Sequence, residues 1–329
     1  MSVRLTDFQK RLCNVLQEDL PICREPFEDL AKYLGTDEKT LLRETKELKE
    51  QGIIRRISAF INYRALGRVS TLVTAHVPAD SLHAVAEAVN ALENVSHNYL
   101  RQHHYNMWFT LQAASVQNID LTLSDLSGRF GIDFHSLPVE RFFKLEVRFD
   151  AVGEDAENGG LVRNVTTQPR DGTVVLNENQ KRVLTGLQKE LQLTSRPFDF
   201  LCGEGLESED VLGIIQGLID KGVVRRIAAV VNYLKLGYTA NVMFAGQVPQ
   251  DRIAWVGEKL ATFPIVSHCY ERRTFEGWPY NLFAMMHGRS MGEIQNVINQ
   301  FAEAEQIDAF ELLPTAKELK KQPVKYQFE

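Results

Sequence analysis

The chain contains one pattern written twice, and this internal repeat restricts its possible folds more than any other feature. Residues 52–67, GIIRRISAFINYRALG, align with residues 222–237, GVVRRIAAVVNYLKLG, at nine of sixteen positions. Two further pairs match in the same order: VSHNYLR at 95–101 with VSHCYER at 266–272, and YNMWFTL at 105–111 with YNLFAMM at 280–286. Because self-similar segments fold into repeated units, we predict two homologous halves.

Each half changes character midway, which predicts two domains per half. Apolar residues at helical spacing predict three short helices with tight turns at the start of the first half, with Thr6 as an N-cap and Gly35 as a C-cap. The second half predicts helices across 177–221. The β-rich stretches that follow, at 53–63 and 223–233, are typical of the hairpin wing of a winged helix.

The rest of each half predicts the order βαββαβ, which is that of a ferredoxin-like unit. In the first half we expect strands at 69–77, 95–102, 105–112 and 139–149, and helices at 80–92 and 116–130. The expected fold class is α+β, with two tandem copies of a winged helix-turn-helix plus a ferredoxin-like domain that form an internal pseudo-dimer. We place the winged helix-turn-helix domains at 1–66 and 176–236, the ferredoxin-like domains at 67–150 and 237–329, and a linker at 151–175.

Composition directs the search for a ligand site to local clusters. The chain has 37 Lys and Arg against 43 Asp and Glu, a net charge of −6, so we expect no nucleic-acid partner. No apolar run approaches ~18 residues and the start lacks an apolar signal core, so we expect no membrane partner and a cytoplasmic protein. The cysteines form no CxxC pair, so we expect reduced structural thiols and no metal site. They are Cys13, Cys23, Cys202 and Cys269.

The VSHNYLR strand and its counterpart each place polar side chains on one face. Alternation puts Val95, His97, Tyr99 and Arg101 together in the first copy, and Val266, His268, Tyr270 and Arg272 in the second. An imidazole, a phenol and a guanidinium do not make a hydrophobic core, so we expect these faces to line a polar cavity between or beside two sheets. A structural role for each histidine, bonding backbone or tyrosine, remains the alternative.

The turns after these strands add candidate ligand contacts. Gln102–His103–His104 in the first half, and Arg272–Arg273 with Trp278 in the second, are expected at exposed, mobile positions at the sheet edge. In the next strand of the second half, alternation places Phe283, Met285 and His287 on one face.

Paired arginines, Arg55–Arg56 and Arg225–Arg226, lie in the two predicted wings. Adjacent residues of a strand face opposite ways, so one arginine of each pair is expected to point inward, where its fork would suit carboxylates. Solvated wing charge is the alternative.

A helix-turn-helix followed by a ferredoxin-like domain, joined at Leu66–Gly67 and Leu236–Gly237, resembles the Lrp/AsnC family of transcription regulators. The longer motifs VSHNYLRQHHYNMWFTL and VSHCYERRTFEGWPYNLFAMMHG resemble the two related subunits of siroheme decarboxylase, here in one chain. The resemblance implies non-oxidative removal of two acetate carboxyl groups from siroheme, giving 12,18-didecarboxysiroheme in haem or haem d1 biosynthesis. It therefore implies a tetrapyrrole as the small-molecule partner.

For this reaction we expect histidine to act as the general acid, because its ordinary pKa lies near neutrality. The candidate catalytic residues are His97, His103 and His268. The candidate substrate-binding residues are Arg101, Tyr105, Arg272, Arg273, Tyr280, His287, Trp278, Arg55 and Arg225. One histidine is alternatively a ligand of the substrate iron.

We expect no cofactor, because the sequence has no glycine-rich phosphate loop and the macrocycle itself can serve as the electron sink. An apolar wall around the departing carboxylate would favour neutral CO2. The first copy has Asn98 where the second has Cys269, so one composite site, or one active and one vestigial site, is expected.

Two other functions remain open: a ligand-sensing regulator of the Lrp/AsnC type, and a tetrapyrrole carrier without chemistry. A regulator needs a basic recognition helix. The third helix of the second half, LESEDVLGIIQGLIDKG, is acidic and would be repelled by phosphates, which favours a scaffold that does not touch DNA. A further homodimer is also open.

Overall fold

The computed structural model describes residues 5–145, 148–152 and 172–328. Most of the predicted linker at 151–175 lies outside the described residues, as do two positions of the strand predicted at 139–149. The first half contains α1 (Asp7–Leu16), α2 (Pro26–Leu34), α3 (Glu38–Glu50), β1 (Ile54–Ile61), β2 (Val69–Ala75), α4 (Leu82–Ala91), β3 (Val95–Arg101), β4 (Met107–Ala113), α5 (Val116–Phe130) and β5 (Phe134–Leu145).

The second half begins with α6 (Glu178–Leu187), the 3-10 helix η1 (Asp199–Leu201) and α7 (Ser208–Asp220). Then come β6 (Val224–Val231), β7 (Ala240–Gly246), α8 (Ile253–Ala261), β8 (Val266–Arg272), β9 (Leu282–Gly288), α9 (Met291–Ala304) and β10 (Phe310–Lys321). Only η1 lies between α6 and α7, where the first half has α2. Pro197, Gly203 and Gly205 break the helical pattern there.

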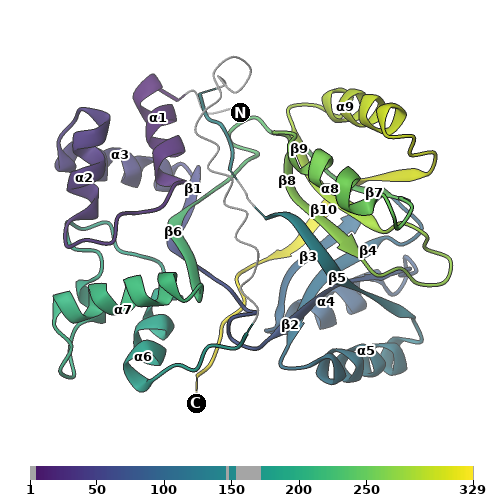
Figure 1. Cartoon of the computed structure of the whole chain (residues 1–329), viewed down its shortest axis with the longest axis horizontal. Coiled ribbons are helices and arrows are strands. Elements are labelled where there is room, and N and C mark those ends of the chain that lie inside the picture. The colour runs from purple at the N-terminus through teal and green to yellow at the C-terminus, as the bar shows by residue number, and fades with distance from the viewer. Residues whose placement is uncertain (1–4, 146–147, 153–171, 329) are drawn as a thin grey trace.

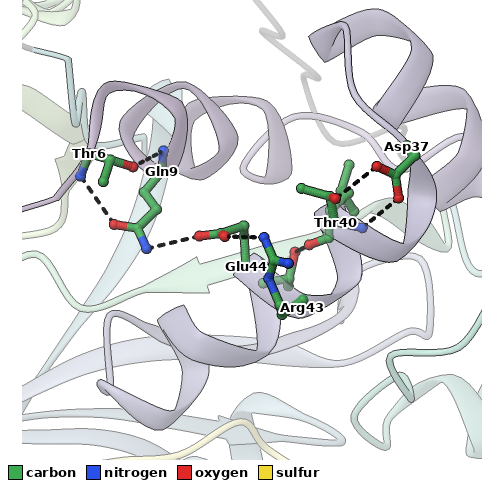
Figure 2. A network of polar contacts seen from close by, with 8 residues as sticks. Thr6, Gln9, Asp37, Thr40, Arg43 and Glu44 are labelled. Carbon is green, nitrogen blue, oxygen red and sulfur yellow. Dashed lines mark hydrogen bonds and ion pairs between the residues drawn. The ribbon is translucent and has the colours of Figure 1, made fainter.

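Local capping explains where the first helices begin and how they are joined (Figure 2). The Thr6 hydroxyl accepts from the Gln9 backbone N–H at 3.2 Å, and the Gln9 side chain accepts from the Thr6 N–H at 3.1 Å. Asp37 caps α3 by accepting from the Thr40 N–H at 2.9 Å. Gln9 also donates to Glu44 at 3.1 Å, which ties α1 to α3. The predicted cap at Thr6 is confirmed.

Residues 53–63 and 223–233 do not form hairpin wings, so this prediction was wrong. Each contributes a single strand, and β1 pairs antiparallel with β6 of the other half. Neither strand contains the Gly or Asn that a tight hairpin turn requires, so each stays extended and offers its edge to the other. Figure 1 shows this two-stranded ribbon between the helices α1–α3, α6 and α7 and the remaining strands.

The other strands of the described residues close a barrel in the order β10-β3-β4-β2-β5-β8-β9-β7. β5 and β10 connect the strands of the two halves, because each pairs first with a strand of its own half and then with a strand of the other half. Residues 134–138 of β5 pair with β2 and residues 139–145 with β8, so the strand predicted at 139–149 begins earlier. Each strand changes its partner at a proline, Pro138 in β5 and Pro314 in β10.

Helices cover the outside of the barrel, with α4 and α5 on the first-half strands and α8 and α9 on the second-half strands (Figure 1). Each pair packs on its own apolar cluster, represented by Val85 and Leu111 in one and Val256 and Met286 in the other. Among the helices of the described residues, none combines the length and the apolarity needed to span a bilayer. The barrel interior is left for other side chains.

Candidate functional site

A cavity of about 1390 Å³ occupies one end of the barrel. Its wall continues beyond the barrel onto the β1–β6 ribbon, α1, α2 and the segment 322–326. At its floor, Trp108 and Phe283 belong to an apolar cluster that fills the rest of the barrel interior. The sequence predicted a polar-lined cavity between or beside two sheets, and the structure places it inside the barrel that the two sheets close.

Both histidine strands face the cavity, with one correction to the predicted faces. His97, Tyr99 and Arg101 line it from β3, and His268, Tyr270 and Arg272 from β8. Val95 and Val266 lie instead in the clusters under the helices. A register shift before each histidine, between Val95 and His97 and between Val266 and His268, breaks the alternation. Ser96 and Ser267 line the cavity in their place.

The two histidines have different hydrogen-bond partners. His97 Nδ1 lies 2.8 Å from the Ser96 hydroxyl, whereas His268 Nδ1 lies 2.8 Å from the Tyr270 hydroxyl. Burial lowers the pKa of His97 to about 4 and that of His268 to about 3. Nearby cations act in the same direction, chiefly Lys321 on His97. Both imidazoles are therefore neutral at pH 7 in the ligand-free protein.

His287 also reaches the cavity, but both of its ring nitrogens have protein partners. Its Nε2 lies 3.0 Å from the amide nitrogen of Asn241, which can only donate, so Nε2 accepts. The proton then sits on Nδ1, which lies 3.2 Å from the Ser267 hydroxyl. Burial lowers the pKa of His287 to about 3. These two contacts fix the orientation of the His287 ring in the cavity wall.

Arg101 is buried and Arg272 is half-buried, and the shortest hydrogen bonds of both cations are to backbone carbonyl groups. Arg101 Nη1 donates to Leu313 O at 2.7 Å, and Arg272 Nη1 donates to Leu137 O at 2.8 Å. The Nε atoms of both are buried and have no hydrogen-bond partner within the described residues. Burial lowers the pKa of each guanidinium to about 10, so both remain charged at neutral pH. A buried cation with an unused donor suits an anionic ligand.

The cavity as a whole is strongly basic, although the chain is acidic. Among the described residues, ten arginines and lysines line it against two acidic residues, Glu18 and Asp19. The basic residues are Arg11, Arg55, Arg56, Arg101, Arg148, Arg225, Arg226, Arg272, Lys321 and Lys325. Both arginines of each ribbon pair, Arg55–Arg56 and Arg225–Arg226, line the cavity, whereas only one arginine of each pair was expected to point inward. Such a surplus attracts a ligand that carries several carboxylates.

The five remaining predicted residues are not among those that line the cavity: His103, Tyr105, Arg273, Trp278 and Tyr280. Trp278 was expected at an exposed position but is 2% exposed, with its ring 5.4 Å from that of Trp108 on the far side of the floor. Tyr105 and His103 pack against it. Arg273 is exposed and pairs with Glu140 at 3.2 Å.

Several cavity residues were missed by sequence reasoning. Two glutamines at the ends of equivalent helices hold chain segments at the cavity mouth. The Gln17 side chain donates to the backbone carbonyl of Phe149 and accepts from its backbone N–H. The Gln188 side chain makes the same two hydrogen bonds with Tyr326. The Phe149 ring contacts His287 edge-on at 4.9 Å, and the Tyr326 hydroxyl donates to the Gln112 side chain at 2.9 Å. The dense lysines at 317–325 were the one signal in the sequence for the C-terminal segment.

Comparison with known families matches both parts of this architecture. An AsnC-like ligand binding domain matches residues 65–144 and 235–320, and a siroheme decarboxylase NirDL-like HTH domain matches residues 9–55. The chain is thus an α+β protein that combines a helix-turn-helix with AsnC-like ligand-binding domains. A siroheme decarboxylase of Hydrogenobacter thermophilus is 35% identical over 96% of this chain and 94% of its own length. The chain belongs to the siroheme decarboxylase family.

Other relatives agree with this placement. The siroheme decarboxylase NirDL subunit of Paracoccus denitrificans is 30% identical over 94% of this chain and 93% of its own length. The crystal structure of the siroheme decarboxylase NirDL matches with a TM-score of 0.72 at 33% identity, over 98% of this chain and 94% of that one. The same protein has been crystallised in co-complex with an iron-uroporphyrin III analogue, and that structure matches equally well.

Proposed function

We propose that this chain removes the carboxyl groups of two acetate side chains of siroheme as CO2. The observation that carries the proposal is the cation-lined cavity inside the barrel, in which a His–Tyr–Arg triplet occurs twice. Siroheme is a polycarboxylate with a flat apolar macrocycle. Arginines from the ribbon and barrel suit its carboxylates, and Trp108 and Phe283 at the floor suit an apolar ring face.

The reaction breaks the bond between the acetate methylene carbon and its carboxyl carbon. The electron pair stays with the methylene carbon and spreads into the macrocycle, CO2 leaves, and one proton converts the methylene to a methyl group. We infer that no cofactor is needed, because the substrate supplies both the electron sink and the iron. His97 and His268 are the proposed proton donors, with Arg101 and Arg272 holding neighbouring carboxylates. A histidine that ligates the substrate iron is the alternative role.

The neutral state of these histidines links binding to proton uptake. A neutral imidazole is a poor acid at pH 7, but several carboxylates placed beside it favour its charged form and raise its pKa. We infer that siroheme binding charges at least one cavity histidine, so that the acid is created by the substrate. His103, in contrast, lies behind the cavity floor, and its catalytic role has less support.

We also infer the arrangement of the whole chain: two tandem copies in an internal pseudo-dimer, with domains at 1–66, 67–150, 176–236 and 237–329. The β1–β6 ribbon and the barrel built from strands of both halves support it. The four cysteines are all unpaired, which fits the reducing cytoplasm. The acidic α7, with Glu209 and Asp210 in its first turn, supports a scaffold that does not bind DNA.

The test is an anaerobic incubation of the full chain with siroheme, followed by chromatography and mass spectrometry of the product. Loss of the mass of two CO2 molecules supports the decarboxylase. A spectral shift with unchanged mass would instead indicate a carrier or sensor, and salt-sensitive DNA binding would then separate those two.

The proton donors are tested in the same assay. His97→Ala and His268→Ala are each compared with His83→Ala, whose side chain on α4 is 85% exposed and outside the cavity. We expect a large loss of turnover in at least one cavity variant and none in the control. Wild-type turnover in both cavity variants would refute the proposed acids.

A further inference from the structure

The two His–Tyr–Arg triplets face neighbouring strands of opposite chemistry. β10 runs beside β3 and places Thr315, Glu318 and Lys321 opposite Arg101, Tyr99 and His97. β5 runs beside β8 and places Val139, Phe142 and Leu145 opposite Arg272, Tyr270 and His268. We name these two sets the charged wall and the apolar wall. They occupy the same register positions in the two halves, so the barrel presents one triplet next to charges and the other next to hydrocarbon.

The charged wall is part of a network of ions. Lys321 lines the cavity, lies 3.9 Å from Glu318 and has its ammonium 4.8 Å from the Tyr233 ring centroid. Glu318 also lies 3.7 Å from Arg55 of the ribbon. Thr315 accepts from Arg101 at 3.2 Å and donates to Asn241 at 2.8 Å. Lys321 and Arg55 can therefore bind carboxylates of the ligand beside His97.

The three residues of the apolar wall have no ionisable side chain. Cations do lie near this side: the Arg64 guanidinium is 4.1 Å from the Phe142 ring centroid, and Arg225 and Arg272 are close enough to His268 to lower its pKa. Val139, Phe142 and Leu145 all line the cavity. The Phe142 ring meets the Tyr270 ring edge-on at 5.2 Å. The Tyr270 hydroxyl in turn lies 2.8 Å from His268 Nδ1, so the imidazole and phenol are hydrogen-bonded to each other against hydrocarbon.

The chemistry of decarboxylation distinguishes these surroundings. A cation beside a carboxylate stabilises the charged ground state but not neutral CO2, and so raises the barrier to its loss. Hydrocarbon beside the same group disfavours the charge and favours the transition state, in which the charge has left the carboxyl group. Carboxylates that the substrate keeps are best held by the charged wall, and the carboxylate that departs is best placed against the apolar wall.

We propose that the two halves of the cavity have different tasks: the charged wall anchors carboxylates that siroheme retains, and the apolar wall surrounds the acetate that leaves as CO2. This division rests on the proposed decarboxylase function. The electron pair of the broken bond passes to the macrocycle. Of the two proposed proton donors, the division selects His268, which with Tyr270 brings the proton from solvent to the methylene carbon. Both acetates then react in succession at the His268 side, and the macrocycle is repositioned between the two steps.

The test exchanges the equivalent wall residues in the full chain, as Leu145→Lys and Lys321→Leu. Lys317→Leu makes the second change at an exposed position of the same strand, outside the cavity, and serves as the control. Single-turnover decarboxylation of siroheme is followed anaerobically by product mass, with the enzyme in excess. Affinity is measured separately, by absorbance titration with iron-uroporphyrin III.

Leu145→Lys is expected to slow the loss of both CO2 molecules about 100-fold, which corresponds to about 3 kcal/mol in the activation barrier at 1.36 kcal/mol per tenfold. The same variant should bind iron-uroporphyrin III at least as tightly as the wild type. Lys321→Leu is expected to weaken binding about 10-fold, in line with loss of one charge-assisted contact, and to keep the single-turnover rate at saturation. Lys317→Leu should match the wild type in both measurements. If Leu145→Lys does not fold, Phe142→Gln tests the same wall.

Three results are decisive. Rapid loss of one CO2 by Leu145→Lys, with accumulation of a monodecarboxylated product, would show that each half has its own reaction site and would overturn the division. A normal rate in Leu145→Lys with a lost rate in Lys321→Leu would reverse the assignment and also overturn it. Unchanged siroheme mass with the wild-type protein would refute the proposed function itself.

Discussion

Arg101 is the residue whose replacement best separates a binding role from a structural one. It is 4% exposed, and the burial of its charge lowers its pKa from 12.5 to about 10. At 1.36 kcal/mol per pKa unit, keeping the guanidinium charged costs about 3 kcal/mol more in the folded protein than in water. Arg101→Met removes this cost and keeps most of the apolar volume of the side chain.

The same substitution also removes favourable contacts. The hydrogen bonds from Nη1 to Leu313 O and to the Thr315 hydroxyl are lost, and each contributes about 1 kcal/mol. The two effects nearly cancel, so we expect the free energy of unfolding of the ligand-free protein to stay within about 2 kcal/mol of the wild-type value, or to rise. Loss of one charge-assisted contact should weaken tetrapyrrole binding by about 10- to 100-fold.

Urea unfolding followed by circular dichroism measures the stability, and absorbance titration with iron-uroporphyrin III measures the affinity. Arg129→Met is the control, because Arg129 is an exposed arginine on α5 whose ion pair with Asp125 contributes little. If Arg101→Met lowered the free energy of unfolding by more than about 3 kcal/mol and left the dissociation constant unchanged, Arg101 would be a structural residue and the reasoning would be wrong.

Three further predictions concern packing and protonation. Gly257→Ala in α8 should lower the free energy of unfolding by about 1–3 kcal/mol in urea, because the added Cβ would lie 2.3 Å from the Phe143 ring. Gly213→Ala in α7 is the control: a Cβ there meets nothing within 4 Å, so the free energy of unfolding should rise by up to about 1 kcal/mol. Equal losses of stability at both sites would contradict the packing explanation. The free energy of unfolding should fall as the pH drops from 6.5 towards 4. Buried His287, with its pKa lowered to about 3, stays neutral in the folded protein over this range, whereas the same histidine takes up a proton in the unfolded chain. His287→Gln should reduce the pH dependence of the free energy of unfolding, and an unchanged pH dependence would show that other groups cause it. Binding of iron-uroporphyrin III at pH 7 should take up protons, measured as different calorimetric heats in buffers of different ionisation enthalpy, and equal heats would show that the cavity histidines stay neutral.

The sequence predicted the residues of the two triplets because their signal is local and repeated. His97, Tyr99 and Arg101 share a face by simple alternation, and so do their counterparts. The polarity of that face argued against a hydrophobic core, and the structure places all six side chains in one cavity. The valines were assigned to the wrong face, because a register shift of one residue reverses the orientation of every side chain beyond it.

The residues beyond the triplets depended on contacts between distant segments. Val139, Phe142 and Leu145 are spaced by three because β5 has register shifts after Val139 and after Phe142, whereas alternation would have placed residues 139, 141, 143 and 145 together. Trp278 follows a turn-like sequence that predicts exposure, yet its loop folds back onto the barrel floor. No local rule reports either outcome.

The sequence by itself determined that there are two related halves, which segments of each are helical or extended, and which short strands carry imidazole, phenol and guanidinium groups. These features follow from periodicity, capping and repetition over a few residues. Only the tertiary structure decided that the ribbon strands pair between halves, that β5 and β10 cross at Pro138 and Pro314 to close one barrel, and that one triplet lies beside charges and the other beside hydrocarbon. Strand partners are chosen by burial and edge pairing between segments far apart in the chain, so their chemistry meets only when the barrel closes.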